Sequence, residues 1–213
     1  MKELIKALQK TGLSWRFEKR DVPFVNVKPY LFIFSGHGEW YAYVKDAREK
    51  LVLCDVWRGD EVKTVLLGED EQYFATCIPC EVKDLEETFN ILTPYPVKEA
   101  RRRGLDVRRQ GEWHFVPLDE EESVAMKIVE KENLFSFIPS FPLGLHHTAE
   151  IAIVIHRHAR WKLPVCLPEI LVQGMINARN HSPLYLPEWH KVYRNYTSPL
   201  LYPFTEERMA FGD

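Results

Sequence analysis

The stretch that decides the fold reads LVLCDVWRGDEVKTVLLGEDEQYFATC and spans residues 51–77. Residues 51–57, 62–67 and 72–77 are rich in β-branched and aromatic side chains, a composition typical of strands. Turn-forming residues separate the three runs, with Gly59 in the first connection and Gly68 in the second. Connections this short join antiparallel neighbours, because a parallel crossover needs about a dozen residues or more. We therefore predict an antiparallel β-meander.

Elements on both sides of the meander extend this prediction. Before it, residues 30–34 and 40–44 have the composition of two more strands, and the chain begins with a short helix that Gly12 ends. After it, Asp84 and Glu87 have the spacing of a capping box, which predicts a helix that runs to about residue 92.

A proline-rich junction follows that helix. Thr93-Pro94-Tyr95-Pro96 ends it, and Pro96 suits the first turn of a second helix over residues 97–103, which Gly104 closes. We predict a boundary here, between an N-terminal β-meander with helices (residues 1–95) and a histidine-rich β unit (residues 96–213). A helix–helix corner inside one domain is the alternative interpretation.

The second half again mixes short helices and strands. We predict a strand over residues 112–117, an acidic helix over residues 120–131 and a packed irregular loop over residues 134–145. Four more strands are expected at residues 151–158, 169–178, 184–186 and 189–195. The predicted fold class is therefore α+β, with mainly antiparallel β-sheets and a few short helices.

Composition and charge narrow the class of protein. The 213 residues are 46% hydrophobic and 28% charged, the balance of an ordinary globular protein, and the net charge is −3. This charge argues against a surface that attracts nucleic acid everywhere, although a local basic patch is compatible with it. The sequence has no signal-peptide pattern and no apolar run of eighteen residues. We therefore expect a cytoplasmic protein without a membrane partner. In that compartment its four cysteines are expected to be reduced thiols.

Six of the eight histidines lie between residues 144 and 195. Histidine is the commonest metal ligand, and three imidazoles with a water suit a zinc-type divalent metal. His156 and His158 would share one face of a strand, and His181 and His190 would meet within a few ångströms across a hairpin. The predicted metal ligands are His146, His147, His181 and His190. Imidazoles that hydrogen-bond backbone and aromatic groups are the alternative, since no compact spacing such as His-Glu-x-x-His is present.

Acid–base chemistry without a metal is a second possibility for the same histidines. Two imidazoles can cleave RNA, one accepting the 2′-hydroxyl proton and the other protonating the leaving oxygen, while a nearby cation stabilises the charge on the phosphate. The predicted catalytic residues are His181, His190, Lys191 and Arg194.

A cluster of arginines predicts a nucleic-acid-binding surface. Guanidinium groups can pair with phosphates, and the aromatic residues that follow the cluster can stack on exposed bases. The candidates are Arg101, Arg102, Arg103, Arg108 and Arg109. The alternative interpretation is that these cations offset the dipole at a helix C-terminus and otherwise face water.

One segment carries a resemblance. Residues 109–117, RQGEWHFVP, resemble the Arg-Gln-Gly-Glu-Trp-Phe-Phe-(Val/Ile)-Pro segment of a loosely defined set of uncharacterised phage and bacterial proteins. In that set a Gly-x-His-His block follows, and then a histidine, a short strand and Trp-His-x-Val-x-x-Asn. Residues 144–147 and 181–195 are similar to these two blocks, so the resemblance spans roughly residues 65–195. His114, where the set has an aromatic residue, and the long insertion over residues 120–143 depart from it, and the resemblance implies no established activity.

Two functional hypotheses follow. The first is a histidine-centred protein, with or without a metal, that performs phosphodiester chemistry on RNA or single-stranded nucleic acid. The second is a non-catalytic accessory module, of the kind phages and mobile elements encode, that binds a protein or nucleic acid. The first requires at least three of the six histidines to converge in an open cleft.

Overall fold

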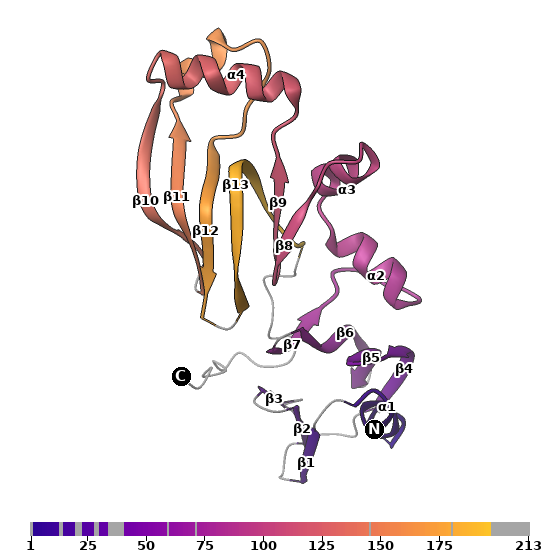
Figure 1. The fold of residues 1–213 in the computed structure, drawn as a ribbon. Coiled ribbons are helices and arrows are strands. Elements are labelled where there is room, and N and C mark those ends of the chain that lie inside the picture. Colours follow the sequence, from indigo (N-terminus) through magenta and orange to yellow (C-terminus); the bar gives the residue numbers. More distant parts are fainter. Residues whose placement is uncertain are drawn as a thin grey trace. The chain divides into compact units, whose positions relative to one another are not determined.

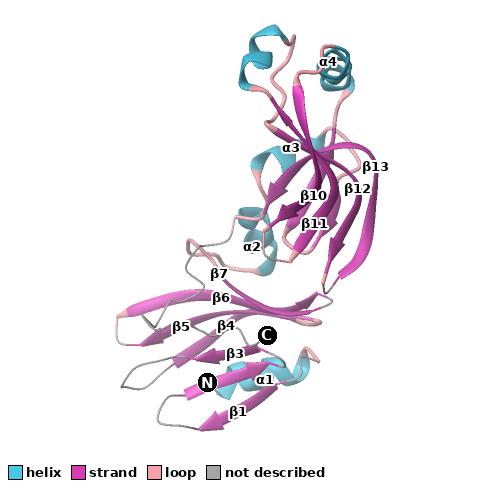
Figure 2. Ribbon diagram, turned by 90° about the vertical axis from the view of Figure 1, so that its left-hand side faces the viewer, coloured by secondary structure: helices cyan, strands magenta, loops and turns pink. Residues whose placement is uncertain are grey.

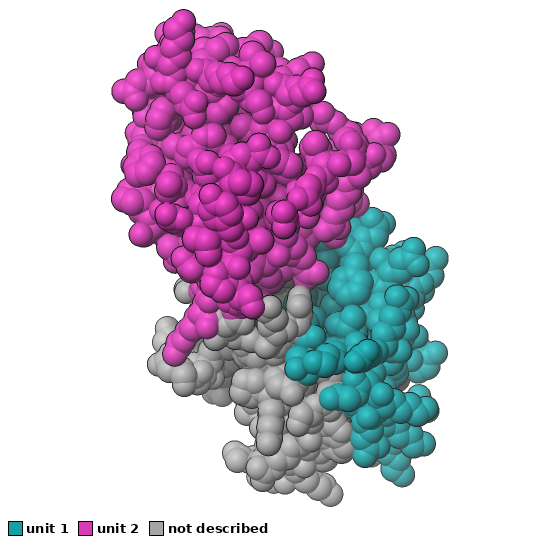
Figure 3. Space-filling model, in the orientation of Figure 1, with its two compact units in different colours: residues 1–92, 196–213 teal, residues 93–195 magenta. Residues whose placement is uncertain are grey.

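The computed structural model describes residues 2–12, 15–19, 23–27, 30–33, 41–58, 60–70, 72–144, 146–179 and 181–196. The predicted fold class is confirmed, because a few short helices accompany three antiparallel sheets (Figure 1 and Figure 2). Two compact units are present, coloured separately in Figure 3. Unit 1 contains the described residues up to Leu92 together with Tyr196, and unit 2 is Thr93–Asn195, so the division falls three residues before the boundary predicted from the prolines.

Unit 1 contains the predicted meander. Its four-stranded sheet has the order β4-β5-β6-β7, with every neighbouring pair antiparallel, and a three-stranded sheet has the order β1-β2-β3. The strands are β1 (Trp15–Lys19), β2 (Pro23–Val27), β3 (Tyr30–Ile33), β4 (Tyr41–Arg48), β5 (Leu51–Arg58), β6 (Glu61–Asp70) and β7 (Gln72–Cys77).

Helices cover both faces of the four-stranded sheet. Alternate residues of β5 point to opposite faces, so Val52 packs with Leu4 of helix α1 (Lys2–Lys10), whereas Leu53 packs with Leu85 of helix α2 (Leu85–Leu92). The predicted cap of α2 is present, since the Glu87 backbone N–H donates to Asp84 Oδ1 at 2.8 Å. The core of unit 1 is therefore built from residues that the strand pattern already marks as apolar.

Unit 2 is organised on one six-stranded sheet with the order β10-β11-β12-β13-β9-β8, again antiparallel throughout. Its strands are β8 (Arg108–Gln110), β9 (Trp113–Pro117), β10 (Phe135–Leu143), β11 (His147–Ile155), β12 (Ile170–Ala178) and β13 (His181–Arg194). Its helices are α3 (Tyr95–Arg102), α4 (Glu120–Lys131) and the 3-10 helix η1 (Arg157–Lys162).

Three predictions for unit 2 are wrong. Residues 134–145 are not an irregular loop, because β10 occupies most of them as an edge strand, where Pro139 and Pro142 cost few ladder hydrogen bonds. Residues 184–186 and 189–195 are not separate strands but parts of β13. Finally, β11 ends at Ile155, because His156 is already the N-terminal cap of η1.

Strand β13 is strongly bent. Its pairing with β12 shifts register, so that Gly174 faces Leu186 while Val172 faces His190. Figure 1 shows β13 rising beside β12 and then turning over towards β9. The sheet consequently folds around an apolar core that includes Phe115, Val172 and Leu186.

Helices α3 and α4 pack on unit 2 through separate clusters. Val97 and Ala100 of α3 contact Val116, whereas Ala125, Met126 and Val129 of α4 pack with strands β11 and β12. No helix among the described residues is both long and apolar enough to cross a membrane. All four cysteines are free thiols, as expected.

Candidate functional site

Two of the predicted histidines meet at one end of the unit 2 sheet. His147 is the first residue of β11 and His181 the first of β13, and both pair with Ala178, the last residue of β12. Paired residues of neighbouring strands share a face of the sheet, so the two rings flank the small alanine side chain. The ring centroids are 5.3 Å apart, with an angle of 32° between the ring planes. We call this region, formed by Gln110, Gly111, Glu112, Trp113, His147, His181 and Arg194, the histidine end.

Gly111, in the turn between β8 and β9, lies directly against both imidazoles. A Cβ atom at this position would lie 2.8 Å from His181 Nε2 and 3.4 Å from His147 Nε2, and the backbone φ is +56°. Only glycine combines this backbone conformation with so close an approach. Both Nε2 atoms therefore point at the same turn.

Trp113 connects His147 to the last residue of β13. The Trp113 ring lies 6.4 Å from the His147 ring, and Trp113 pairs with Arg194, the last residue of β13. The Arg194 guanidinium carbon stands 5.6 Å from the centre of the Trp113 ring, a cation–π distance, and one guanidinium nitrogen lies 3.5 Å from Glu112 Oε1. The Arg194 guanidinium is thus linked to the two histidine rings through the Trp113 ring.

The histidine end contains spare hydrogen-bonding capacity. Among the described residues, Gln110 Oε1, Trp113 Nε1 and His147 Nε2 are buried atoms without a hydrogen-bond partner. The Gln110 amide is held in place because its Nε2 donates to the backbone oxygens of Ser182 at 2.6 Å and Ile176 at 3.3 Å. Buried polar atoms nearly always have partners in folded proteins, so these three atoms are donors and acceptors available to a polar ligand or a water.

Burial sets the protonation of His147. The side chain is only 4% exposed, and burial lowers the pKa of its imidazole. The Glu112 carboxylate opposes this effect and favours the charged ring, whereas His181 adds to it. His147 is therefore a neutral imidazole at neutral pH, able to accept or donate one proton at Nε2 according to its tautomer.

His190 lies elsewhere. The expectation that His181 and His190 meet across a hairpin is wrong, because both lie in the single strand β13 and pair with opposite ends of β12. The His190 ring is 3% exposed, its Nδ1 lies 2.7 Å from the carbonyl oxygen of Glu188, and burial lowers its pKa. Its position fits the structural alternative rather than proton transfer to a substrate.

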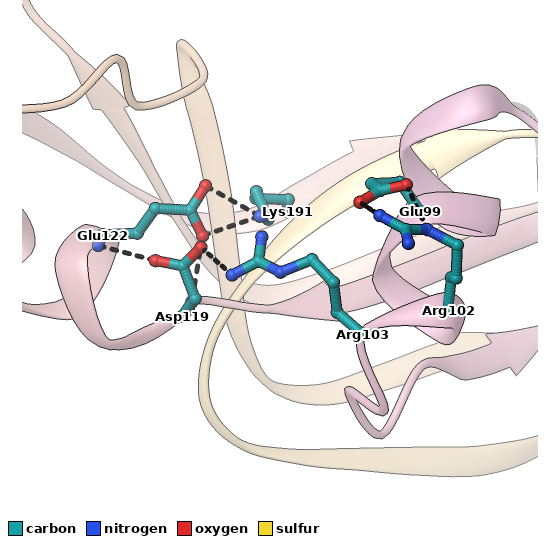
Figure 4. Close-up of polar contacts among 6 residues, drawn as sticks. All are labelled: Glu99, Arg102, Arg103, Asp119, Glu122 and Lys191. Carbon is teal, nitrogen blue, oxygen red and sulfur yellow. Dashed lines mark hydrogen bonds and ion pairs between the residues drawn. The ribbon is translucent and has the colours of Figure 1, made fainter.

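Lys191 holds helix α4 to the sheet. Its ammonium group donates to Glu122 Oε1 at 2.8 Å and to Oε2 at 2.7 Å, and the residue is 8% exposed (Figure 4). Glu122 also completes a capping box with Asp119, the N-cap of α4, which pairs with Arg103 at 2.8 Å. Lys191 therefore lies outside the histidine end, in an ion-pair network that supports the fold.

The remaining histidines do not complete a set of three. His146 is exposed beside His147, and no group of three or more His, Cys, Asp or Glu side chains in the described part of the chain is placed to hold a metal ion. His156 and His158 form a second pair, with ring centroids 5.4 Å apart, at the start of η1 rather than on a strand face. The predicted metal ligands thus divide into the contacting pair His147 and His181, the exposed His146 and the distant His190.

The predicted arginine surface is exposed but partly paired. Arg102 binds Glu99, Arg103 binds Asp119 and Arg108 binds Asp106, each with a nitrogen–oxygen distance of 2.7–2.8 Å. The pairs of Arg102 and Arg108 are solvent-exposed and therefore weak, whereas Arg103 binds the half-buried Asp119, and Arg101 is also exposed. The Nε of Arg109 donates to the backbone oxygen of Gly111 at 2.8 Å, so the arginine strip (Arg101, Arg102, Arg103, Arg108 and Arg109) reaches the histidine end.

Sequence reasoning did not name Gln110, Gly111, Glu112 or Trp113 as site residues. The available signal was the RQGEW segment itself, because the three blocks that carry the resemblance all contribute to the histidine end. The first and last blocks are also joined by a 2.7 Å hydrogen bond between His114 Nε2 and Asn195 Oδ1. Comparison of the chain with protein-family models, curated proteins and solved structures found no match.

Proposed function

We propose that the protein acts on RNA or single-stranded nucleic acid through the histidine end, which binds a phosphodiester and positions two imidazoles beside it. One observation carries this proposal: the rings of His147 and His181 are in contact, Trp113 connects His147 to the Arg194 guanidinium, and buried polar atoms of this region lack partners. This combination of neutral imidazole, second imidazole and cation suits proton transfer on a phosphodiester.

Each residue has a distinct part in this proposal. The neutral imidazole of His147 is the group suited to accept a proton, and His181, which is more exposed, is the partner that donates one to the leaving oxygen. Arg194 offsets the phosphate charge, and the adjoining arginine strip contacts phosphates further along the strand. Only two of the six histidines meet at the histidine end, so the convergence of three set out above is not met among the described residues. The proposal therefore depends on the pair alone, which is the number of imidazoles that proton transfer on a phosphodiester uses.

Binding without cleavage is the second candidate, and the burial of His147 favours it. A residue that is 4% exposed and covered by Gly111 reaches a substrate only if the β8–β9 turn shifts. In that case the same surface binds nucleic acid as a non-catalytic accessory module.

A binding and cleavage screen tests both candidates. Labelled unstructured RNA and single-stranded DNA are incubated with the wild type and with His181→Ala, His147→Ala and His158→Ala, the last removing a histidine outside the site. We expect binding by the wild type, with any cleavage reduced by about a hundredfold or more in the first two variants and unchanged in His158→Ala. Binding without cleavage selects the second candidate, and equal behaviour of the wild type and all variants overturns the histidine end as the site.

A chelator separates metal-free from metal-assisted chemistry. Cleavage that survives EDTA supports proton transfer by the two imidazoles alone. Cleavage that is abolished by EDTA and restored by a divalent metal instead assigns His147 and His181 as metal ligands, as the sequence prediction had it.

A further inference from the structure

Helix η1 presents a tryptophan almost entirely to water. Trp161 is 93% exposed, the highest value among the exposed large hydrophobic residues of the described chain, ahead of Tyr95 at 69%. A tryptophan side chain normally buries most of its large apolar surface, and exposed tryptophans are enriched at interfaces, so Trp161 is a candidate binding residue.

The segment that carries Trp161 is anchored on the core of unit 2. Ala159, two residues before it, is fully buried in the cluster that contains Met126 and Val129 of α4, and Leu163 packs against the same cluster. The backbone N–H groups of His156 and Ala159 donate to Leu134 and His156 at 3.0 and 2.9 Å. Figure 1 and Figure 2 show this segment beside α4. The indole is thus held outward by a folded element.

Basic residues are close to Trp161 in the sequence. The sequence of η1, RHARWK, places basic residues on both sides of Trp161, and Arg157 and Lys162 are exposed. The Lys162 ammonium is 3.7 Å from Glu132 Oε2, with both side chains about half exposed, so this ion pair is too weak to neutralise the lysine permanently. The surface therefore combines a flat aromatic face with positive charge.

We infer that Trp161 is a base-stacking contact for a single-stranded nucleic acid, with Arg157 and Lys162 binding the flanking phosphates. An unpaired strand offers flat rings and regularly spaced negative charges, and this pairing of chemistry with the surface favours it over an uncharged partner. The inference rests on the proposed function, because it places a second contact for the same ligand on unit 2.

The distance between the two contacts sets the length of strand required. Strand β11 begins at His147, in the histidine end, and finishes at Ile155, immediately before the residues that lead into η1. Its eight residue steps span roughly 26 Å at the usual rise of a β-strand. A mononucleotide can occupy one contact, whereas only an oligonucleotide can occupy both.

The test measures oligo(rU) and oligo(dT) affinity by fluorescence anisotropy for the full chain and for Trp161→Ala, Trp161→Phe and Phe137→Ala. Phe137, 57% exposed on the edge strand β10, controls for loss of an exposed aromatic elsewhere on unit 2. We expect Trp161→Ala to weaken binding by about fivefold or more, the lower end of the cost of losing one base–aromatic stack, and Trp161→Phe to lose less. Phe137→Ala should leave the affinity unchanged.

The outcomes separate this inference from the proposed function. Unchanged affinity in Trp161→Ala, with weakened binding in His181→Ala, overturns the stacking contact alone. Absence of oligonucleotide binding by the wild type overturns both. Trp161-dependent binding to anionic phosphatidylserine vesicles or to a poly-glutamate peptide, but not to oligonucleotides, assigns the surface to a different class of partner and also overturns the inference.

Discussion

Gly111 is the residue on which the geometry of the histidine end depends most. Its φ of +56° is a conformation that favours glycine, and its α-carbon lies against two imidazole nitrogens. Gly104, after helix α3, has a similar φ of +77° but open space where a Cβ would be built. The two glycines therefore differ mainly in whether other atoms occupy the space that a Cβ atom would need.

We predict that Gly111→Ala destabilises unit 2 more than Gly104→Ala does. Both variants have the strain of a left-handed alanine, but only the first pushes a methyl group into His181 and His147, for an additional loss of about 1–3 kcal/mol. Chemical denaturation of the two variants measures the difference. Equal losses would mean that the imidazoles do not occupy the position against the turn.

Buried neutral histidines make stability depend on pH. Burial lowers the pKa of His114, His147 and His190 below the ordinary value of 6.5, and each side chain is at most 4% exposed. Below about pH 6.5 the unfolded chain therefore binds protons that the folded chain does not, and the free energy of unfolding falls as the pH falls. The contribution of these three neutral histidines to the free energy of unfolding is fully present above pH 6.5.

We predict a decline in the free energy of unfolding from pH 7 towards pH 5, with each neutral histidine contributing up to about 1.4 kcal/mol per pH unit. Urea denaturation at a series of pH values measures the slope, and His190→Gln should reduce it. A free energy of unfolding that stays level across this range would contradict the buried, neutral state of these imidazoles.

The sequence predicted the residues whose roles depend on near neighbours in the chain, but it predicted only part of the histidine end. Asp84 caps α2 and Gly104 follows α3 with positive φ, as their spacing indicated, because such roles depend on neighbours within one turn. His147 and His181 were named from residue type alone. The unpartnered atoms of Gln110 and Trp113 were not predictable, because they arise where segments distant in sequence pack together.

At the scale of the elements, residues at the start of α4 form ion pairs with Arg103, which follows α3, and with Lys191 of strand β13. Asp119 accepts from the Glu122 backbone at 2.9 Å, Glu122 accepts from the Asp119 backbone at 2.9 Å, and the same two carboxylates bind Arg103 and Lys191. The Glu122 backbone N–H and Arg103 both hold the pKa of Asp119 below its usual value. This network fixes Lys191 on the face of β13 that packs against α4.

We predict that Asp119→Ala lowers the free energy of unfolding by about 1–2 kcal/mol, the usual cost of an N-cap. Glu120→Gln is the matched control, since Glu120 is an exposed acid in the same first turn and contributes only the smaller dipole effect. Thermal or urea denaturation measures the stabilities. An equal effect of both substitutions would show that the capping box does not stabilise α4.

The prediction of elements succeeded where the local pattern was strong. The meander of unit 1 follows from alternating apolar strands and short turns, and it is confirmed. Strand β10 was missed because its prolines suit a loop equally well until the strand is known to be at a sheet edge. Strand β13 was divided in the prediction because Pro187 and Glu188 interrupt its pattern at the point where its pairing with β12 shifts register.

At the scale of the whole molecule, the proposed functional residues all belong to unit 2. Its apolar clusters consist of its own residues, and the histidine end, the arginine strip and Trp161 all belong to it. The sequence indicated two halves and placed the histidines in the second. It did not indicate that Trp113 lies beside both His147 and Arg194, since this depends on the long-range pairing of β9 with β13.

The central claim is that Arg194 and the two imidazoles bind phosphate, and the salt dependence of oligo(rU) affinity tests it most directly. Arg48 in unit 1 is the matched control: its side chain is 58% exposed with a carboxylate at 3.6 Å, against 56% and 3.5 Å for Arg194. We predict that Arg194→Ala reduces the slope of log affinity against log salt by about 0.7, the value for one phosphate contact to a single strand, while Arg48→Ala leaves it unchanged. The same slope for the wild type and both variants would contradict the claim.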